Sequence, residues 1–501
     1  MGFPRQNSDD LIRAKRGVTV PFCLSVNVDN ETLVDLHVTR LFRLLPGKRL
    51  VVLASRGNTQ FVLKVFLGRT ARKYYSQELD GIMAIADLNI PTPALRWKGR
   101  LKDGKGYVLA LEYLDGCEDM ESAWLKTASL EGKTALLADC LQIFATMHSR
   151  GIRQKDIHLN NFVIYANAIY AIDGGGMCFS SSPQGLDREK SLNNLARFFA
   201  QFKPANDPLV HSVYPAYARA RGWAVEETCS TLLQKRIVQK RQERKVHYLA
   251  KTLRDCSRFL CEKNLTRFLV CERSCYSDTL KTLLARPDEF IEAAREKGEI
   301  LKEGNSATVA LVHTSERSLV VKRYNPKSGF GILRKALKPS RARNSWVQAH
   351  QLDFLGIASI KPVAVLEKRL GPFVSQAYFI SEYVEGINMD ECYSQGSSGQ
   401  TKVNGDSIKG ILNILDALKL AKVTHGDLKA TNFRYSENGL VLLDLDSMRN
   451  HKDNRAFKKA FAKDINRFLD NWKSRPEIYG KFKSATDNLI AAELHQSGSD
   501  M

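Results

Sequence analysis

Apolar residues form three short runs near the start of the chain, interrupted by few polar residues, a pattern typical of strands. Turn residues separate the runs, first Pro46-Gly47-Lys48 and then Arg56-Gly57-Asn58. The pattern predicts a hairpin and a further strand, over residues 41–45, 49–54 and 61–66. A helical pattern follows, and a second long one is predicted over 130–149.

A similar order of elements begins again near residue 300. A strand, a turn of small residues and a second strand are predicted over 300–312, followed by a strand over 319–324 and a helix over 340–352. Residues 394–406 are rich in Ser, Gly and Gln and predict a flexible loop.

Two polar motifs with equal spacing follow these elements. In the first, Asn161 lies 5 residues after Asp156, and Asp173 lies 17 residues after it. In the second, Asn432 and Asp444 lie at the same distances from Asp427. An acidic turn beside an apolar strand is common, but two unrelated turns would rarely agree at both spacings. We therefore interpret the chain as a tandem of two related domains.

Magnesium-dependent phosphoryl transfer from ATP requires these residue types. The first Asp, Asp427 or Asp156, would accept the proton of the attacking hydroxyl. The Asn and the second Asp would hold the metal, and these are Asn432 and Asp444, with Asn161 and Asp173. The run His425-x-Asp427-x-x-x-x-Asn432 resembles the catalytic loop of the protein-kinase-like superfamily.

This resemblance implies a lysine that pairs with the ATP phosphates and a helix Glu that orients it. Lys64 and Glu78 fit these roles in the first copy, and Lys322 is the corresponding lysine in the second. Gly304 and Ser306 lie in a turn that could cover the phosphates. The helix after Lys322 offers no Glu, so Gln348 and Asp353 remain alternatives.

The two copies depart from the kinase pattern in different ways. Gln154 stands where the second copy has His425, and we expect this change to distort the first loop. The run Gly174-Gly175-Gly176 is expected to leave the segment after Asp173 loose. On this comparison the second domain is favoured as the principal catalyst.

The expected fold is α/β (α+β), with two tandem protein-kinase-like domains, each made of a small β-rich N-lobe and a helical C-lobe. The expected boundaries place a polar tail at 1–33, the first domain at 34–233, a basic helical connector at 234–297, the second domain at 298–485 and a C-terminal tail at 486–501. A length of 501 residues is compatible with two such domains.

The formal net charge of +21 favours anionic partners. The stretch from Gln234 to Arg273 has twelve Lys or Arg against four Asp or Glu, which suits an anionic substrate or membrane surface as well as a solvated helix. It lacks the interleaved aromatic residues of a single-strand nucleic-acid platform, so no nucleic acid is expected. Residues Lys235, Arg236, Lys240, Arg241, Arg244 and Lys245 are the candidates for facing lipid.

No apolar run reaches the length of a membrane span, and residues 1–16 are too polar for a signal peptide. A cytoplasmic protein, peripheral on the inner face of the membrane, is expected. The ten cysteines are then expected as thiols. A zinc site is the alternative for the cluster Cys256, Cys261, Cys271 and Cys275, although packing on helix faces is favoured.

Several segments of the second domain together resemble the bacterial lipopolysaccharide core kinase family. They are residues 301–309, 321–325, 340–346, 425–429 and 443–446. The resemblance implies ATP- and Mg-dependent transfer of phosphate to a heptose or Kdo hydroxyl of the inner core. A protein or small-molecule kinase is the alternative, as is a partly non-catalytic binding or scaffold protein.

Overall fold

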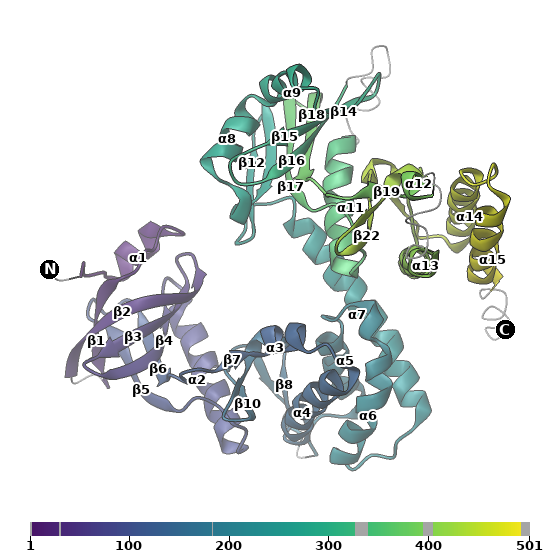
Figure 1. Cartoon of the computed structure of the whole chain (residues 1–501). Helices are drawn as coiled ribbons and strands as arrows, with labels where there is room; N and C mark the ends of the chain where they lie inside the picture. Colours follow the sequence, from purple (N-terminus) through teal and green to yellow (C-terminus); the bar gives the residue numbers. More distant parts are fainter. Residues whose placement is uncertain (1–2, 30–31, 183, 326–338, 394–403, 492–501) are drawn as a thin grey trace. The chain divides into compact units, whose positions relative to one another are not determined.

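The computed structural model describes residues 3–29, 32–182, 184–325, 339–393 and 404–491 (Figure 1). Helices and strands are mixed throughout, which confirms the predicted α/β class. The chain divides into two compact units, unit 1 over residues 1–242 and unit 2 over 243–501, and the boundary lies within helix α7 (Glu227–Lys251). Most of the loop predicted over 394–406 lies outside the described residues.

Unit 1 begins with a closed barrel whose strands follow the order β1-β2-β3-β4-β6-β5. Alternate residues point inward, so Leu36, Val52, Leu63 and Val108 form its core. Three of the strands, β2, β3 and β4, contain the apolar runs from which strands were predicted. The strands are β1 (Phe22–Val28), β2 (Thr32–Leu45), β3 (Arg49–Arg56), β4 (Thr59–Phe66), β5 (Leu95–Leu101) and β6 (Tyr107–Glu112).

The rest of unit 1 is mainly helical. Helix α4 has the predicted bounds, Leu130–Ser149, and its first turn is capped by Ser129, whose hydroxyl accepts from the Gly132 N–H. The other helices are α2 (Ala71–Asp87), α3 (Met120–Lys126), α5 (Arg188–Phe199) and α6 (Pro208–Ala220). Short strands lie between them, namely β7 (Glu118–Asp119), β8 (Ile152–Gln154), β9 (Phe162–Tyr165), β10 (Ala168–Ala171) and β11 (Met177–Phe179).

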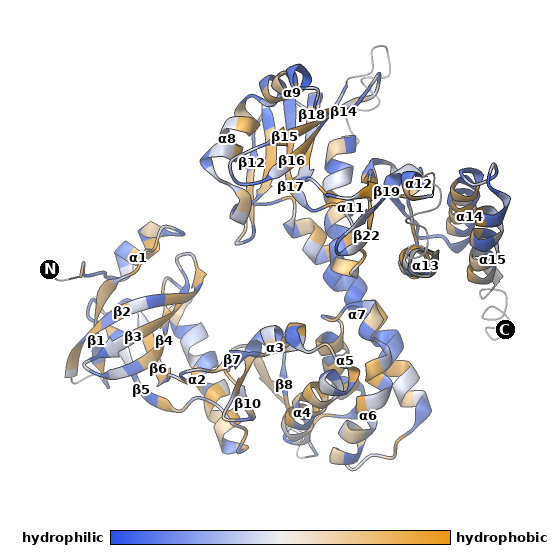
Figure 2. Cartoon of the chain, in the orientation of Figure 1, coloured by the Kyte–Doolittle hydropathy of each residue, from blue (hydrophilic) through white to orange (hydrophobic). Residues whose placement is uncertain are grey.

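Unit 2 begins with a seven-stranded sheet in the order β12-β13-β17-β18-β16-β15-β14. Helices α8 (Asp278–Ala285) and α9 (Pro287–Glu296) pack on one face with Leu269, and α11 (Arg341–Leu355) packs on the other with Val270. Figure 2 shows apolar residues concentrated in these strands. The strands are β12 (Phe259–Lys263), β13 (Arg267–Glu272), β14 (Ile300–Gly304), β15 (Ala307–His313), β16 (Ser318–Tyr324), β17 (Pro362–Leu370) and β18 (Phe373–Glu382).

A helical part again follows the sheet. Its helices are α12 (Met389–Cys392), α13 (Asn404–Leu420), α14 (Asn454–Asp470) and α15 (Pro476–Ala491). Its short strands are β19 (Ile387–Asn388), β20 (Val423–Thr424), β21 (Phe433–Ser436), β22 (Gly439–Leu442) and β23 (Arg449–Asn450). Residues 486–491 belong to α15 rather than to a tail, and the remaining residues of the predicted tail lie outside the described part.

The N-terminal residues do not form the polar tail that we expected. Helix α1 (Ser8–Ala14) has a capping box between Asn7 and Asp10, and it buries Leu11. Strand β1 completes the barrel by pairing with both β2 and β5. Its apolar residues alternate over too few positions to stand out from the polar segment around them.

The basic connector predicted over 234–297 is also corrected. The chain leaves helix α7 at Lys251 and forms β12 and β13, both of which belong to the sheet of unit 2. Within α7 itself, Arg241 and Lys245 are each only 7% exposed, and Arg241 pairs with Asp207. These two side chains therefore do not face outward, as a lipid-binding set would require.

No helix of the described residues is both long and apolar enough to cross a membrane.

Candidate active sites

In unit 1, Lys64 and Glu78 form a buried ion pair. Lys64 is on strand β4 and Glu78 is on helix α2, and they are 6% and 0% exposed. The lysine ammonium also donates to the Ile172 carbonyl at 2.7 Å. Arg49 on β3, which the sequence did not single out, lies 3.4 Å from the other Glu78 oxygen. The predicted lysine and helix Glu are thus brought together.

Helix α2 can approach the segment after Asp173 because both contribute glycines. A Cβ atom on Gly81 would lie 1.9 Å from the Gly174 carbonyl oxygen. The Gly174 N–H donates to Glu78 at 3.1 Å, and the Gly175 N–H donates to Asp173 at 2.9 Å. The expectation that the glycine run is loose is therefore wrong. The run packs against α2, because the absence of side chains permits this close contact.

Two carboxyl groups of this cluster titrate in opposite directions. Burial raises the pKa of Glu78, even though the charges of Lys64 and Arg49 oppose that shift. Burial acts in the same sense on Asp173, but Lys64 and Arg49 outweigh it and lower the pKa of that carboxyl. Asp173 is consequently a carboxylate at neutral pH, the form that can bind a cation.

The first of the two predicted catalytic loops lies between β8 and the short helix η1 (Leu159–Asn161). The Asp156 side chain is 84% exposed, and the Asn161 amide nitrogen donates to the Asp156 carbonyl at 2.8 Å. Gln154 donates to the Asp173 carbonyl at 3.0 Å and so joins the loop to the end of β10. The Asn161 side-chain oxygen is buried and has no hydrogen-bond partner in the structure.

The loop of unit 2 has the same form. Asn432, at the end of η4 (Ala430–Asn432), donates to the Asp427 carbonyl at 2.8 Å, and His425 Nε2 lies 3.0 Å from the Leu443 carbonyl. Asp464 on α14 accepts from the backbone N–H groups of His425 and Gly426. Asp464 was not expected from the sequence.

Asp427 lies between two cations. Its carboxylate is 3.1 Å from Lys429 and 2.5 Å from Arg467 on α14. Lys429 follows Asp427 closely in the motif, whereas Arg467 is brought in by the fold and the sequence gave no sign of it. The pair of cations makes the surroundings of Asp427 basic.

Lys322 on β16 pairs with the chain after β22 and not with helix α11. Its ammonium lies 2.5 Å from Asp444 and 2.9 Å from Asp446. Burial disfavours the charge, but Tyr324, Asp444 and Asp446 together raise the pKa of Lys322. Asp444 has a φ of 54° and precedes the short helix η5 (Leu445–Ser447).

Neither alternative for the missing helix Glu is a partner of Lys322. The Gln348 side chain is buried, and its oxygen has no hydrogen-bond partner in the structure. Asp353 is 59% exposed and lies 3.9 Å from Arg258. Helix α11 instead directs Arg341 toward Asp446, at 2.7 Å. Helix α11 thus contributes a cation, and both carboxylates that pair with Lys322 lie on the opposing segment.

Gly304 and Ser306 flank the predicted turn between β14 and β15, and both are exposed. Asn325 closes this turn, since its side chain donates to the Gly304 carbonyl at 3.1 Å and its N–H donates to the Ser306 carbonyl at 3.2 Å. The strand, turn and strand predicted here are confirmed.

The donor groups fit a magnesium ion. Each unit offers one Asn and one Asp, and Mg²⁺ binds to few protein oxygens because phosphates and waters complete its coordination. The buried, unpartnered oxygen of Asn161 is an acceptor that such an ion would satisfy. Within the described ranges, no group of three or more His, Cys, Asp or Glu is arranged to hold a metal without further ligands.

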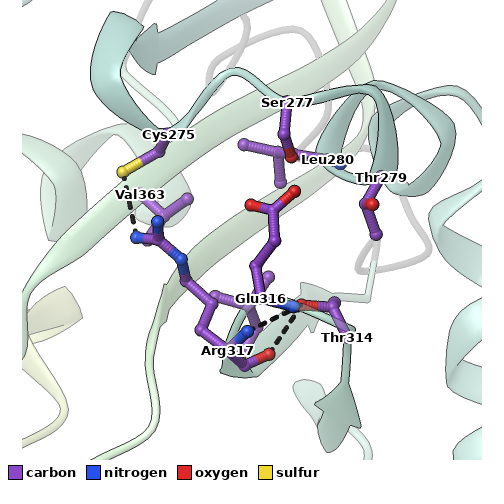
Figure 3. Close-up of a pocket in the computed structure, with 9 residues that line it drawn as sticks. Cys275, Ser277, Thr279, Leu280, Thr314, Glu316, Arg317 and Val363 are labelled. Carbon is purple, nitrogen blue, oxygen red and sulfur yellow. Dashed lines mark hydrogen bonds between the residues drawn. The ribbon is translucent and has the colours of Figure 1, made fainter.

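The four clustered cysteines are not on helix faces. Cys261 and Cys271 lie on strands β12 and β13, Cys275 is in a short helical turn, and none of the ten cysteines forms a disulfide. Cys275 lines a small pocket in which Arg317 donates to its sulfur at 3.3 Å (Figure 3). No predicted site residue lines this pocket, which lies on the face of the sheet covered by α8.

Comparison with known proteins gives two findings. Residues 292–479 match the model of the lipopolysaccharide kinase (Kdo/WaaP) family. A solved structure, the PknI kinase domain of M. tuberculosis, is 15% identical over 41% of this chain and 95% of that chain, with a TM-score of 0.26. No curated protein shows a significant match to the chain.

The matched segment runs from helix α9 to helix α15 and contains Lys322, Asp427, Asn432 and Asp444. This family consists of kinases that act on sugar hydroxyls. Residues 292–479 are therefore similar to the lipopolysaccharide kinase (Kdo/WaaP) family.

Proposed function

We propose that unit 2 transfers phosphate from ATP, with Mg²⁺, to a heptose or Kdo hydroxyl of the lipopolysaccharide inner core. One observation carries the assignment of the site: within the family-matched segment, Lys322 on the sheet lies 2.5 Å from Asp444 at the end of β22. This contact joins the phosphate-binding lysine to the carboxylate proposed for the metal.

The residues of unit 2 would divide the work as follows. Asp427 accepts the proton as the sugar hydroxyl attacks, and Lys322 binds the ATP phosphates. Asn432 and Asp444 would hold Mg²⁺, which would offset the negative charge of the phosphates. The turn from Gly304 to Ser306 would lie over the phosphates.

The acceptor side is basic, which suits an anionic glycolipid. Lys429 and Arg467 flank the proposed base, and each is about two-fifths exposed, so both can reach a bound ligand. The net charge of +21 would favour approach to lipopolysaccharide at an anionic inner-membrane surface. On α7 only the outward residues, such as Lys235 and Arg244, can serve this purpose.

Unit 1 has the features of a second nucleotide site. Its ion pair between Lys64 and Glu78 is complete, and Asp156, Asn161 and Asp173 have the same sequence spacing as the residues of unit 2. Because unit 1 lies outside the family-matched segment, we propose nucleotide binding for it and leave sugar phosphorylation to unit 2.

The acceptor is tested by transfer of radiolabel from ATP. Lipopolysaccharide from cells that lack this protein is incubated with the full chain, ATP and Mg²⁺, and core phosphate is then analysed. Label on a core sugar is expected. Label on protein or on a small alcohol alone supports the alternative kinases, and no label on any acceptor supports a binding or scaffold role.

The two nucleotide sites are counted by calorimetry with a non-hydrolysable ATP analogue and Mg²⁺. The full chain should bind two equivalents, and Asp173→Asn or Asp444→Asn should each reduce this to one. A single equivalent in the wild type that Asp173→Asn leaves intact would remove unit 1 from the proposal.

A further inference from the structure

The strand-end segments of the two units differ at one position that faces the nucleotide-site lysine. Counting from the proposed metal-binding Asp, Asp173-Gly174-Gly175 in unit 1 corresponds to Asp444-Leu445-Asp446 in unit 2. Asp446 therefore stands where unit 1 has Gly175. A Cβ atom on Gly175 would lie 3.0 Å from a carboxylate oxygen of Glu78, so in unit 1 the helix acid lies in the space beside this position.

The helices that face these segments differ in the opposite sense, since α2 carries an acid where α11 carries a cation. In α2, Gly81 contacts the strand-end segment and Glu78 lies three residues before it. In α11, Asn344 donates to the Asp446 carbonyl at 2.9 Å, and Arg341 lies three residues before it. Arg341 thus takes the place of Glu78, and the acid moves from the helix to the strand end.

The Asp446 carboxylate is buried and accepts several hydrogen bonds. Its side chain is 3% exposed, and its oxygens accept from Lys322 at 2.9 Å, Arg341 at 2.7 Å and the Ser447 hydroxyl at 3.1 Å. Lys322 and Arg341 also lie 5.1 Å from the centre of the Tyr324 ring. Each unit therefore groups its lysine and one arginine with two carboxylates. The arginine comes from strand β3 in unit 1, as Arg49, and from helix α11 in unit 2, as Arg341.

We propose that Asp446 is the positioning residue that orients Lys322 in unit 2, as Glu78 on helix α2 orients Lys64 in unit 1. This inference rests on the proposed function of unit 2. Its consequence is that Asp444 can turn to a metal ion while Lys322 stays in place, because Asp446 retains the lysine. The missing helix Glu is then no sign of an inactive site.

The test moves the acid of unit 2 from position 446, after β22, to position 341 on helix α11. It uses the full chain with Asp173→Asn, so that nucleotide binding reports on unit 2, and it compares Asp446→Gly, Arg341→Glu and the double variant. Each single variant should weaken binding of the ATP analogue and Mg²⁺ and lower transfer about 10- to 100-fold, because misplacing a reacting group by about 1 Å has effects of that size. The double variant should recover at least tenfold, since the helix then supplies the acid.

The matched control is Asp470→Asn, an exposed acid paired with Lys473, which should leave both readouts unchanged. Thermal unfolding of every variant identifies those that fail to fold, and Asp446→Asn, which keeps the side-chain volume, replaces Asp446→Gly if the latter unfolds.

Unchanged nucleotide affinity in folded Asp446→Gly and Asp446→Asn, with transfer intact, would overturn the inference while leaving the proposed function in place. Weakened affinity in these variants, in a protein that labels no lipopolysaccharide, would support the inference and reject the acceptor. Absence of nucleotide binding at unit 2 of the wild type would overturn both.

Discussion

His425 in unit 2 and Gln154 in unit 1 stand two residues before the proposed base of each loop. His425 Nε2 donates to the Leu443 carbonyl, just after β22, at 3.0 Å. Gln154 Nε2 donates to the Asp173 carbonyl, just after β10, at 3.0 Å. The bond from the loop Asn to the base's carbonyl is 2.8 Å in both units. The distortion expected from Gln154 is therefore absent, because an amide supplies the same donor as an imidazole.

The support behind each loop also differs. Asp464 accepts two backbone N–H groups in unit 2, whereas in unit 1 Asn194 donates to the Gln154 carbonyl at 2.8 Å and lies 3.0 Å from His148 Nε2. The two units thus keep the same hydrogen bonds to the loop and the same pairing of the lysine with carboxylates, although the side chains that make these contacts differ. Residue spacing is thus a better guide to these sites than residue identity.

The largest expected effect concerns the helix acid of unit 1. Glu78→Ala leaves Lys64 buried without its carboxylate, and removing one partner of a buried pair costs about 3–5 kcal/mol. The matched control is Glu112→Ala, which breaks a half-exposed pair with Arg96 and should cost about 1 kcal/mol or less. Urea denaturation of the full chain measures both. Equal, small losses would show that unit 1 does not depend on its helix acid.

The second prediction concerns the pH dependence of the stability of unit 1, where His148 contacts the loop-supporting Asn194. Burial lowers the pKa of His148 to about 4, below the unfolded value, so the folded state holds the neutral ring. Its contribution is fully present above pH 6.5 and is lost as the pH falls toward 4, at a cost on the order of 3 kcal/mol to unit 1.

Unfolding of the wild type and of His148→Gln is followed across this range. The variant should lose less stability on acidification than the wild type. Parallel curves for the two proteins would exclude His148 as the source of the loss.

The third prediction concerns the contact between Gly81 and Gly174, which allows helix α2 to bring Glu78 close to Lys64. Gly81→Ala would place a methyl group 1.9 Å from the Gly174 carbonyl, and overpacking of this kind costs about 1–3 kcal/mol. Gly480→Ala on α15 meets no atom within 4 Å and should stabilise unit 2 by up to about 1 kcal/mol. A neutral Gly81→Ala in thermal unfolding would contradict the close contact.

The smallest effect on stability is expected from replacing Gln154, the hydrogen-bond donor of the unit 1 loop. Gln154→His keeps a donor at this position and should leave the free energy of unfolding within about 1 kcal/mol, whereas Gln154→Leu removes the bond and costs about 1 kcal/mol more. Chemical denaturation distinguishes the two. A larger loss for the histidine than for the leucine would mean that shape, and not hydrogen bonding, fixes this loop.

Sequence spacing predicted much of the geometry of the two candidate sites. The Asp, Asn and Asp positions and the pairing of Lys64 with Glu78 follow from motifs whose elements are continuous in sequence. Asp446 could not be assigned in this way, because no sequence pattern shows that a charged residue two positions after Asp444 is buried against Lys322. Arg467 and Asp464 come from a helix whose approach to the loop is set only by tertiary packing.

The fold predictions failed where polar residues mask short strands. Phe22–Val28 contains Ser25 and Asn27 between its apolar residues, and Phe259–Lys263 ends in charged residues, so the first was taken as a tail and the second as helix. Each gains its stability from neighbouring strands that are distant in the sequence, namely β5 for the first and the rest of the unit 2 sheet for the second.

We expect unit 2 to be the principal catalyst of phosphate transfer to the lipopolysaccharide core. The most direct measurement compares label transfer by the full chain, Asp156→Ala and Asp427→Ala at equal concentration, after circular dichroism has shown that both variants fold. We predict that Asp427→Ala loses about 10²-fold or more, since it removes the proposed base, and that Asp156→Ala keeps transfer within about threefold of the wild type. Loss of transfer in Asp156→Ala, with activity retained in Asp427→Ala, would show that unit 1 and not unit 2 is the principal catalyst.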